Sequence, residues 1–496
     1  MWIFILVAAI LLVIFPLFRQ GFFVTDDGEW MIIRLSSFFQ TLRDGQFPVR
    51  FLGRLNHGFG YPVANFLYPG FLYIGSFFHV LGFSFIGAVK VLLAGSVVLA
   101  GFFTYKWLRT FFSVLASVIG SLFFILSPYL VFDIYTRGSV GEVLAISAIS
   151  LCLWTIEARR KTIFTFVFAL LLVSHNSLAL LFTAFLVAYL LVRRRHDLWI
   201  SSLLSIGMTM FFWFPAISEA RFIQFDAVKV SDPSHYFNQS MSLALGGFGV
   251  FGIILVLFWS KLKHTSLSIY MLIVAIMSLF FATKGSSFFW SGQIATLFQF
   301  PYRFIPLATV VSAWILSAVA DVSKKKTQIA LVAGTLVYLS ASVVPMLKDI
   351  HYVDRPLTYY TTNEGTTTVA NEYMARWAQI FPTNRPLSPL VLYSGQGSVD
   401  IQQYNTQKIV AHITTTEKSV VQQNTVYYPG WGVTINNQPA DISHENELGV
   451  IRVNLPPGAY TYNSEFRETV PRFIADAVSL VSFVGLGVYS FIKRKK

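Results

Sequence analysis

Long apolar stretches recur along most of the chain and are separated by short polar connections. A helix of about 20 apolar residues crosses the roughly 30 Å hydrocarbon core of a bilayer, because each residue adds about 1.5 Å. The pattern therefore predicts an all-α polytopic membrane protein. We expect twelve transmembrane helices, at residues 1–18, 87–106, 112–131, 139–157, 162–175, 177–192, 198–217, 243–260, 266–282, 302–320, 328–346 and 472–492.

Two apolar stretches allow more than one arrangement in the membrane. Residues 66–85 are apolar enough for a further helix, but counting it would place basic turns on opposite sides of the membrane, so we expect a re-entrant or interfacial segment there. The helices at 162–175 and 177–192 are short and are interrupted by polar residues 174–177. One overlong helix is the alternative, but the basic triplets at both ends of the pair favour two crossings.

Composition agrees with the apolar pattern. Of 496 residues, 55% are hydrophobic and 12% are charged, whereas about a quarter of the residues are charged in soluble domains. This excludes a water-soluble enzyme. The single cysteine, Cys152, lies in an apolar stretch, so the sequence contains neither a disulfide framework nor a cysteine metal site.

The formal net charge of +13 is concentrated in short turns between helices and at the C-terminus. A basic excess confined to short turns marks the cytoplasmic side of a membrane protein. We therefore expect both termini in the cytoplasm and no nucleic-acid partner. A bacterial cytoplasmic membrane is the expected location, although an endoplasmic reticulum membrane also fits. The basic runs are 159–161, 193–195, 324–326 and 493–496.

With this orientation, two long segments lie outside the cytoplasm. Residues 1–347 form a transmembrane domain with a large first outer loop at 19–86, and residues 472–496 form the last helix and a basic tail. Residues 348–471 are rich in threonine and turn pairs, with alternating runs at 426–431 and 449–455 that are typical of strands. We expect an extracytoplasmic β-rich domain of about 120 residues, large enough for its own core.

The first outer loop opens with Thr25-Asp26-Asp27-Gly28-Glu29-Trp30. Three carboxylates within four residues at the membrane boundary repel one another, which raises a pKa unless a cation compensates. Such a cluster suits a general base or a divalent-metal ligand set. The alternative is a solvated loop in which Asp26 or Asp27 caps a helix over 31–42.

The same loop continues with basic and polar residues among glycine and proline turns. Arg50, Arg54 and His57 are candidates for binding a phosphate, because guanidinium and imidazole groups donate hydrogen bonds to anions. The alternative is that they neutralise the acids of their own loop or contact lipid headgroups.

A second charged turn, residues 133–142, is expected on the same outer face and contains Asp133, Arg137 and Glu142. Charge at this depth is costly without a partner. Glu142 alone could be explained by the dipole of the helix that begins there.

Two further groups are expected on this face. His175 lies at the apex of the short helical pair, where a structural histidine is the alternative reading, and Arg303 begins a helix, where it can bind a phosphate or extend to lipid headgroups. The ionisable groups thus gather outside, and few lie at mid-membrane, where a channel or pump would place them. This favours an externally facing active site.

Together these features resemble GT-C glycosyltransferases, integral membrane enzymes that take sugars from polyprenyl-phosphate carriers. More narrowly, the chain is similar to the bacterial membrane family labelled 6-pyruvoyl-tetrahydropterin synthase-related, although it has no histidine triad for zinc. Residues 427–431 are similar to a motif in the C-terminal β-domains of related proteins. The strings that resemble the narrower family are 26–28, 44–50, 58–62 and 299–304.

The resemblance implies a membrane glycosyltransferase with Asp26 as the general base and Asp27 as its close competitor; the family's second acid corresponds to Asp133 or Glu142. Direct attack by an acceptor hydroxyl would invert the anomeric carbon. The acceptor would be an envelope glycan, lipid or protein, positioned by the β-domain, and membrane lipids would surround the helices.

Charge developing on the departing phosphate would be stabilised by Arg303, with Arg54 or Arg137 assisting. No cofactor is required, although Asp27, Asp133 or Glu142 could hold Mg²⁺ or Mn²⁺. A transporter or flippase for a lipid-linked saccharide is the alternative function; a structural envelope protein would leave the first-loop acids unexplained.

Overall fold

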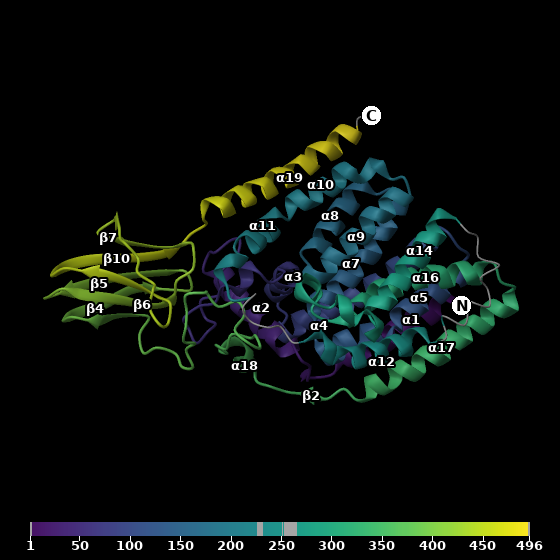
Figure 1. Ribbon diagram of the computed structural model, residues 1–496, viewed down its shortest axis with the longest axis horizontal. Coiled ribbons are helices and arrows are strands. Elements are labelled where there is room, and N and C mark those ends of the chain that lie inside the picture. The colour runs from purple at the N-terminus through teal and green to yellow at the C-terminus, as the bar shows by residue number, and fades with distance from the viewer. Residues whose placement is uncertain (1, 226–231, 250, 252–264, 495–496) are drawn as a thin grey trace.

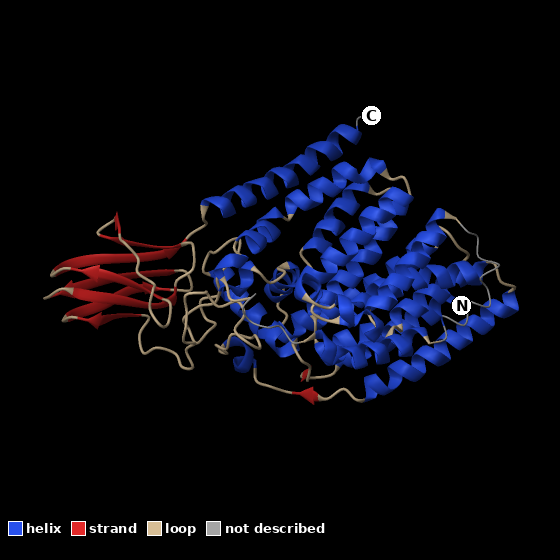
Figure 2. Ribbon diagram, viewed as in Figure 1, coloured by secondary structure: helices blue, strands red, loops and turns tan. Residues whose placement is uncertain are grey.

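The computed structural model describes residues 2–225, 232–249, 251 and 265–494. Most of this chain forms a body of helices, and a β-sandwich extends from one end of the body (Figures 1 and 2). The first outer loop and the segment that follows α17 fill the layer between the two. The sequence-based expectation of a helical body with a β-rich C-terminal part is confirmed.

The helical body follows the apolar stretches. The outer loop contributes α2 (Gly28–Arg43) and α3 (Gly70–Val80). The other helices are α1 (Trp2–Ile14), α4 (Phe85–Leu108), α5 (Val114–Ile125), α6 (Pro128–Phe132), α7 (Val140–Glu157), α8 (Lys161–Leu172), α9 (Asn176–Val192), α10 (Trp199–Met208), α11 (Met210–Ser218), α12 (Phe237–Phe248), α14 (Ser266–Phe281), α15 (Gly292–Phe298), α16 (Ile305–Asp321), α17 (Lys325–Lys348), α18 (Leu357–Thr361) and α19 (Val470–Arg494).

Six helical segments of the described chain are long and apolar enough to cross a membrane: 85–108, 114–137, 140–157, 301–321, 325–348 and 470–489. A seventh is added if α10 and α11, which meet at an angle of 61°, form one bent span. The shorter apolar helices are α1, α3, α8, α9 and α14. The expected total of twelve is therefore not established, and the expected span at 243–260 lies partly outside the described residues.

A re-entrant or interfacial segment was expected at residues 66–85, and the length of α3 agrees with it. This helix has 11 residues, or about 16 Å, which is too short to cross the hydrocarbon core. Exposed apolar side chains gather where α3 turns into α4, including Phe77, Val80 and Leu81. The segment therefore suits the membrane interface better than a crossing.

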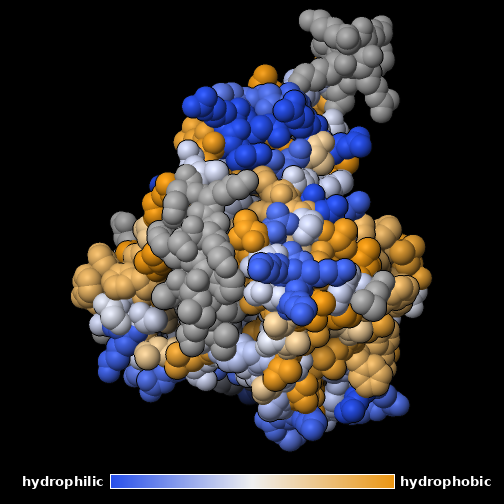
Figure 3. All heavy atoms as spheres, turned by 90° about the vertical axis from the view of Figure 1, so that its right-hand side faces the viewer, coloured by the Kyte–Doolittle hydropathy of each residue, from blue (hydrophilic) through white to orange (hydrophobic). Residues whose placement is uncertain are grey.

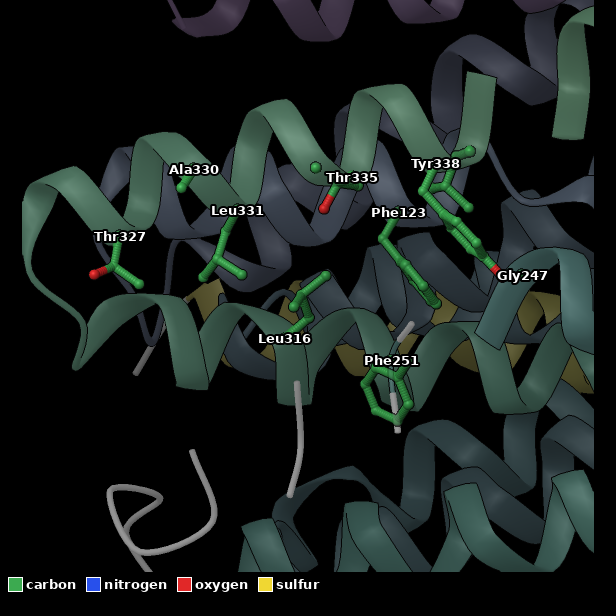
Figure 4. A pocket seen from close by; sticks show the side chains of 11 residues that line it. Phe123, Gly247, Phe251, Leu316, Thr327, Ala330, Leu331, Thr335 and Tyr338 are labelled. Carbon is green, nitrogen blue, oxygen red and sulfur yellow. The ribbon is translucent and has the colours of Figure 1, made fainter. Parts of the chain in front are cut away.

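The centre of the body is formed by α5, α7 and α16, which are buried along most of their lengths, whereas α17 and α19 expose most of theirs. Figure 1 shows α17 and α19 along opposite margins of the body. A mostly apolar cavity of about 250 Å³ lies between α5, α12, α16 and α17 (Figure 4). It is lined by side chains such as Phe123, Leu316 and Leu331, and the described residues that line it include no acid, base or histidine.

The short basic turns meet at the end of the body opposite the sandwich. Arg193 of the turn after α9 pairs with Glu157 at the end of α7 at 2.7 Å. The turn before α5 joins the end of α16 through a hydrogen bond of 2.8 Å from the Ser113 amide to Asp321. Figure 3 views this end, where hydrophilic residues gather in the upper part and around the middle and hydrophobic residues cover the flanks.

The sandwich consists of two antiparallel sheets, with strand orders β4-β5-β10-β7-β8 and β3-β6-β9. Alternate residues of β5, such as Ile409 and Ile413, point into a core that also contains Val421 and Val453 of the second sheet. The strands are β3 (Leu390–Ser394), β4 (Gly397–Tyr404), β5 (Lys408–Thr415), β6 (Ser419–Val426), β7 (Trp431–Ile435), β8 (Gln438–Pro439), β9 (Val450–Leu455) and β10 (Gly458–Phe466).

Two expectations for the C-terminal part need correction. The run 426–431 is not one strand: only its ends, Val426 and Trp431, lie in β6 and β7, and residues 427–430 form the turn between them, because Pro429-Gly430 interrupts the alternation and Gly430 has φ 119°. The sandwich begins at Leu390 instead of at 348. The residues before it belong to the outer layer of the body, where β2 (Tyr352–Val353) pairs with β1 (Phe22–Phe23).

Buried ion pairs hold the sandwich and α19 against the body. Arg472 at the start of α19 binds Glu219 after α11 through hydrogen bonds of 2.8 and 2.7 Å, and Tyr428 of the β6–β7 turn donates to the same carboxylate at 2.8 Å. Arg50 of the first outer loop pairs with Glu468 at 3.0 Å and with Asp476 at 2.8 Å. The sandwich is thus fixed beside the first outer loop.

Candidate active site

The first-loop acids lie against a π-helical turn, Asp133–Arg137, that follows α6. The backbone amide of Asp26 donates to the Thr136 carbonyl at 3.0 Å, and that of Asp27 donates to the Arg137 carbonyl at 2.8 Å. Single π-turns within helices are rare and are frequent at functional sites. Two segments more than a hundred residues apart in sequence therefore meet here through their main chains.

This approach depends on Gly138, which ends the π-turn with φ 69°. A Cβ atom at this position would lie 2.6 Å from the Gly28 amide nitrogen and 2.5 Å from Thr25 Oγ1. A glycine is needed both for the left-handed conformation and for the space. The close packing fixes the start of α2 relative to the turn.

The alternative interpretation, in which Asp26 or Asp27 caps the following helix, is wrong. At the start of α2, Thr25 Oγ1 accepts from the Gly28 amide at 2.9 Å, whereas the Asp27 side chain makes no capping hydrogen bond. Asp26 is the more exposed of the two carboxylates but is partly covered, and Asp27 is half-buried. Partial burial and the negative charge of Asp27 raise the pKa of the Asp26 carboxyl, while Arg137 lowers it.

Glu142, in the first turn of α7, is the centre of a buried ion network. Its Oε1 accepts from Arg137 Nη1 at 2.5 Å and from Arg303 Nε at 2.9 Å, and it lies 3.4 Å from His175 Nε2. Its Oε2 accepts from the Tyr129 hydroxyl at 2.5 Å. One carboxylate oxygen thus accepts hydrogen bonds from two arginines.

Arg137 connects this network to the first loop. Its Nη2 lies 3.9 Å from Asp27 Oδ2, and its Nη1 lies 3.3 Å from Asp133 Oδ1. The rings of Phe300 and Tyr302 lie 5.2 Å from the guanidinium carbon, close enough for cation–π attraction. The other oxygen of Asp133 is buried and has no hydrogen-bond partner in the described part of the chain.

Arg303 and His175 complete the network from the neighbouring elements. Arg303 precedes α16 and donates through Nη1 to Gln299 Oε1 at 2.7 Å and to the Phe298 carbonyl at 2.9 Å. His175 caps α9, because its Nδ1 accepts from the Leu178 amide at 3.3 Å. One ring nitrogen of His175 therefore has a structural role as a helix cap, and the other lies near Glu142.

The structure therefore brings together Asp26, Asp27, Asp133, Arg137, Glu142, His175 and Arg303. It separates Arg54 and His57 from them: Arg54 donates to Ser36 of α2 at 2.6 Å, and the His57 amide donates to the Glu364 carbonyl at 2.8 Å. Arg54 contacts α18 and His57 contacts the segment after it, and no described contact joins either of them to Arg303.

Two residues near the network were missed in the sequence. Arg34 of α2 is 6% exposed and donates to both the hydroxyl and the carbonyl of Thr367. The ring of Tyr68 lies 4.7 Å from that of His175. Arg34 could have been found as a cation within an apolar run, because an arginine is rarely buried unless it is paired. Nothing in the sequence distinguished Tyr68.

The side chains suggested for a divalent metal do not form a ligand set. Among the described residues, no group of three or more acidic, histidine or cysteine side chains is placed to hold a metal ion. Both oxygens of Glu142 are engaged by Arg137, Arg303 and Tyr129. The residues present therefore do not fit a metal in this arrangement.

Comparison with known proteins finds no matching family model and no matching curated sequence. Among solved structures, the chain is similar to ArnT from Cupriavidus metallidurans in the apo state, with 16% identity over 72% of this chain and 67% of that one and a TM-score of 0.47. The ArnT structure bound to undecaprenyl phosphate gives 15% identity, coverage of 72% and 68%, and a TM-score of 0.46.

Two further similarities are weaker or more partial. The arabinofuranosyltransferase AftD from Mycobacteria gives 15% identity and a TM-score of 0.47 over 70% of this chain but only 26% of AftD. The Archaeoglobus fulgidus oligosaccharyltransferase gives 15% identity, a TM-score of 0.39, and coverage of 73% of this chain and 53% of that one. At such identities and scores, these similarities carry no weight for the activity of this chain.

Proposed function

We propose that this chain is a membrane glycosyltransferase of the GT-C type that moves a sugar from a polyprenyl-phosphate donor to an extracytoplasmic acceptor. The main support is the arrangement of Asp26 and Asp27, two carboxylates that do not cap a helix. They lie against the ion network of Arg137, Glu142 and Arg303. The reacting carbon of a lipid-linked sugar lies near the headgroup plane, so a catalytic group must stand at that boundary.

Asp26 is the proposed general base. It takes the proton from the acceptor hydroxyl while the oxygen forms a bond to the anomeric carbon, and the bond from that carbon to the phosphate oxygen breaks, with the electron pair leaving on the phosphate. Attack and departure on opposite faces invert the anomeric configuration. The Asp27 carboxylate lies 3.9 Å from the Arg137 guanidinium. Asp26 has no such ion pair among the described residues, so its carboxylate is the freer of the two to accept a proton.

Charge on the departing phosphate needs a cation. Arg303 supplies a fixed positive charge, but its guanidinium is already held by Glu142, Gln299 and a carbonyl. Arg34 forms no ion pair among the described residues and binds only Thr367 and the sulfur of Met31. We therefore add Arg34 to Arg137 and Arg303 as a phosphate-stabilising group.

The decisive experiment compares Asp26→Asn with the unmodified protein in transfer of a radiolabelled sugar from a synthetic polyprenyl-phosphate sugar. We expect loss of transfer with unchanged elution and thermal unfolding. Asp349→Asn is the matched control, because this acid is exposed and lies at the end of α17. Full transfer by Asp26→Asn would remove Asp26 from the reaction.

A transporter or flippase for a lipid-linked saccharide is the second candidate. The break of 61° between α10 and α11 favours it, because transporters often bind their cargo at broken helices. Saturable binding of the lipid-linked sugar without release of polyprenyl phosphate would support this function, whereas turnover requires the enzyme.

A further inference from the structure

A second polar site lies on the other half of α2. A cleft of about 670 Å³ separates the C-terminal turns of α2 from α18 and from the turn between β4 and β5. We call it the arginine cleft, after the three arginines that line it, Arg43, Arg54 and Arg385. Figure 1 shows α2 and α18 at the sandwich end of the helical body. The volume is within the range of small-molecule sites.

Arg54 carries a partly buried positive charge that no carboxylate contacts. Its guanidinium donates to Ser36 Oγ at 2.6 Å and to the carbonyls of Thr361 at 2.5 Å and Ile33 at 3.1 Å, and its Nε has no partner in the described part of the chain. Burial lowers the pKa of Arg54 to about 10, and the charge of Glu364 opposes this shift. A buried cation is usually paired with an acid.

Both acids of the cleft are already engaged by other residues that line it. Glu364 binds Arg385 Nη1 at 2.6 Å, and Asp44 Oδ2 accepts from both the amide and the hydroxyl of Thr406, at 3.0 and 2.7 Å. Arg43 is exposed and has no ion pair among the described residues. Three arginines therefore face two engaged carboxylates, and the cleft keeps a positive excess.

Much of the remaining lining suits a sugar, and Phe39, His79 and Phe85 line the side of the cleft next to α3 and α4. Gln40, Thr361, Thr362 and Asn405 provide amide and hydroxyl groups, which can both donate and accept hydrogen bonds. Tyr404, 45% exposed, provides an aromatic face. Such a mixture matches a ligand that has many hydroxyl groups and an apolar ring face.

We propose that the arginine cleft binds an anionic saccharide, a sugar chain that carries a phosphate or a carboxylate, as the acceptor of the transfer reaction. The acceptor role rests on the proposed function, whereas the binding itself does not. Ser36 in the cleft lies nine residues along α2 from Asp27, or about 14 Å. A sugar chain of several units, held by its charged end in the cleft, would reach the first-loop acids with its other end.

Isothermal titration calorimetry on the detergent-purified full chain tests this binding without any need for turnover. Trehalose 6-phosphate is the anionic probe, and trehalose is its neutral match. Inorganic phosphate and short-chain phosphatidylglycerol distinguish a free anion and a lipid headgroup from a sugar. We expect trehalose 6-phosphate to bind at least about tenfold more tightly than the other three, and less tightly as salt rises.

Arg43→Gln is the main variant, because Arg43 is exposed and we expect its loss to leave the fold intact. Arg467→Gln is the control, since Arg467 is an exposed arginine paired with Glu465. We expect Arg43→Gln to weaken binding of trehalose 6-phosphate about tenfold and Arg467→Gln to leave it unchanged. Arg54→Lys, which keeps the charge but loses the fork of donors, should weaken it less than Arg54→Gln.

Three outcomes would overturn the assignment: no binding of trehalose 6-phosphate, binding that Arg43→Gln does not weaken, or tighter binding of phosphatidylglycerol, which would assign the cleft to a lipid headgroup. If Asp26-dependent transfer persists in any of these cases, only the cleft assignment fails. If Arg43-dependent binding is found but no sugar is transferred, the proposed function fails and the binding site stands.

Discussion

The backbone amide of Asp27 donates a hydrogen bond of 2.8 Å to the carbonyl oxygen of Arg137. This contact joins the start of α2 to the π-helical turn, and the Arg137 side chain then connects the same turn to Glu142 at 2.5 Å. The first-loop acids are therefore positioned by contacts with a buried ion network.

Gly138→Ala should reduce both stability and transfer. A side chain at φ 69° is strained by about 1–2 kcal/mol, and its Cβ would also push against the Gly28 amide, 2.6 Å away. Gly82→Ala is the matched control, because Gly82 has φ 99° but no heavy atom within 4 Å of the added carbon. Equal transfer by the two variants would show that the close packing of α2 on the turn is not needed for activity.

Glu142→Gln should unfold at a markedly lower temperature. The change keeps the shape but removes the charge that neutralises two buried arginines, and breaking a buried ion pair costs about 3–5 kcal/mol. Thermal unfolding in detergent is the measurement. Glu465→Gln, in an exposed pair with Arg467, should change the unfolding temperature very little. A Glu142→Gln protein as stable as the control would mean that the network does not hold the site.

The pH profile of transfer separates the two first-loop acids. If Asp26 is the base, activity falls as pH decreases through its pKa, because only the carboxylate accepts a proton. The negative charge of Asp27 raises this pKa, so Asp27→Asn should move the acidic limb of the profile to lower pH while transfer continues. Complete loss of transfer in Asp27→Asn, with the protein folded, would instead make Asp27 the base.

Chelation should leave the rate unchanged. The described residues gather no set of three metal-ligating side chains, and the proposed mechanism uses arginines where other enzymes use a divalent ion. Transfer is measured with EDTA and again after addition of Mg²⁺ or Mn²⁺. A rate that falls with EDTA and returns with either ion would restore the ligand role suggested for Asp27 and Asp133.

The orientation in the membrane is open to labelling from outside. In a Cys152→Ala background, Asn384→Cys before the sandwich should react with a membrane-impermeant maleimide in intact cells, whereas Lys325→Cys should react only after permeabilisation, because the basic turns are expected in the cytoplasm. The reverse pattern would place the candidate active site on the cytoplasmic side.

The sequence predicted what depends on local patterning. Apolar length located most helices, and the rule for basic turns placed Asp26, Asp133 and Arg303 on one face. In the structure Asp133 and Arg303 share one ion network, and the Asp26 main chain is hydrogen-bonded to the turn that carries Asp133. The sequence could not place Arg54, because the outer loop folds against residues 360–374, far away in the chain, and those tertiary contacts leave no periodic signal. Arg34 was missed because its helix was considered only for the cap that Asp26 or Asp27 could give it, and not for the side chains along it.

The sequence also misled where two signals compete. The alternating residues at 426–431 favour a strand, yet Pro429-Gly430 turns the chain and leaves Tyr428 free to reach Glu219. A motif that resembled part of the β-domain thus proves to be a joint between the sandwich and the helices. Its place could only be found from the partner residues, which lie about two hundred positions earlier.

The pairing of β1 with β2 ties the chain to itself across the whole helical body. Phe22 and Phe23 lie opposite Val353 and Tyr352, and the Val24 amide donates to the His351 carbonyl at 2.9 Å. The segment after α1 is therefore fixed to the segment after α17, from which the chain continues toward the sandwich. Removing the N-terminal helix and its short strand would cut an anchor of the distant C-terminal part as well as one membrane helix.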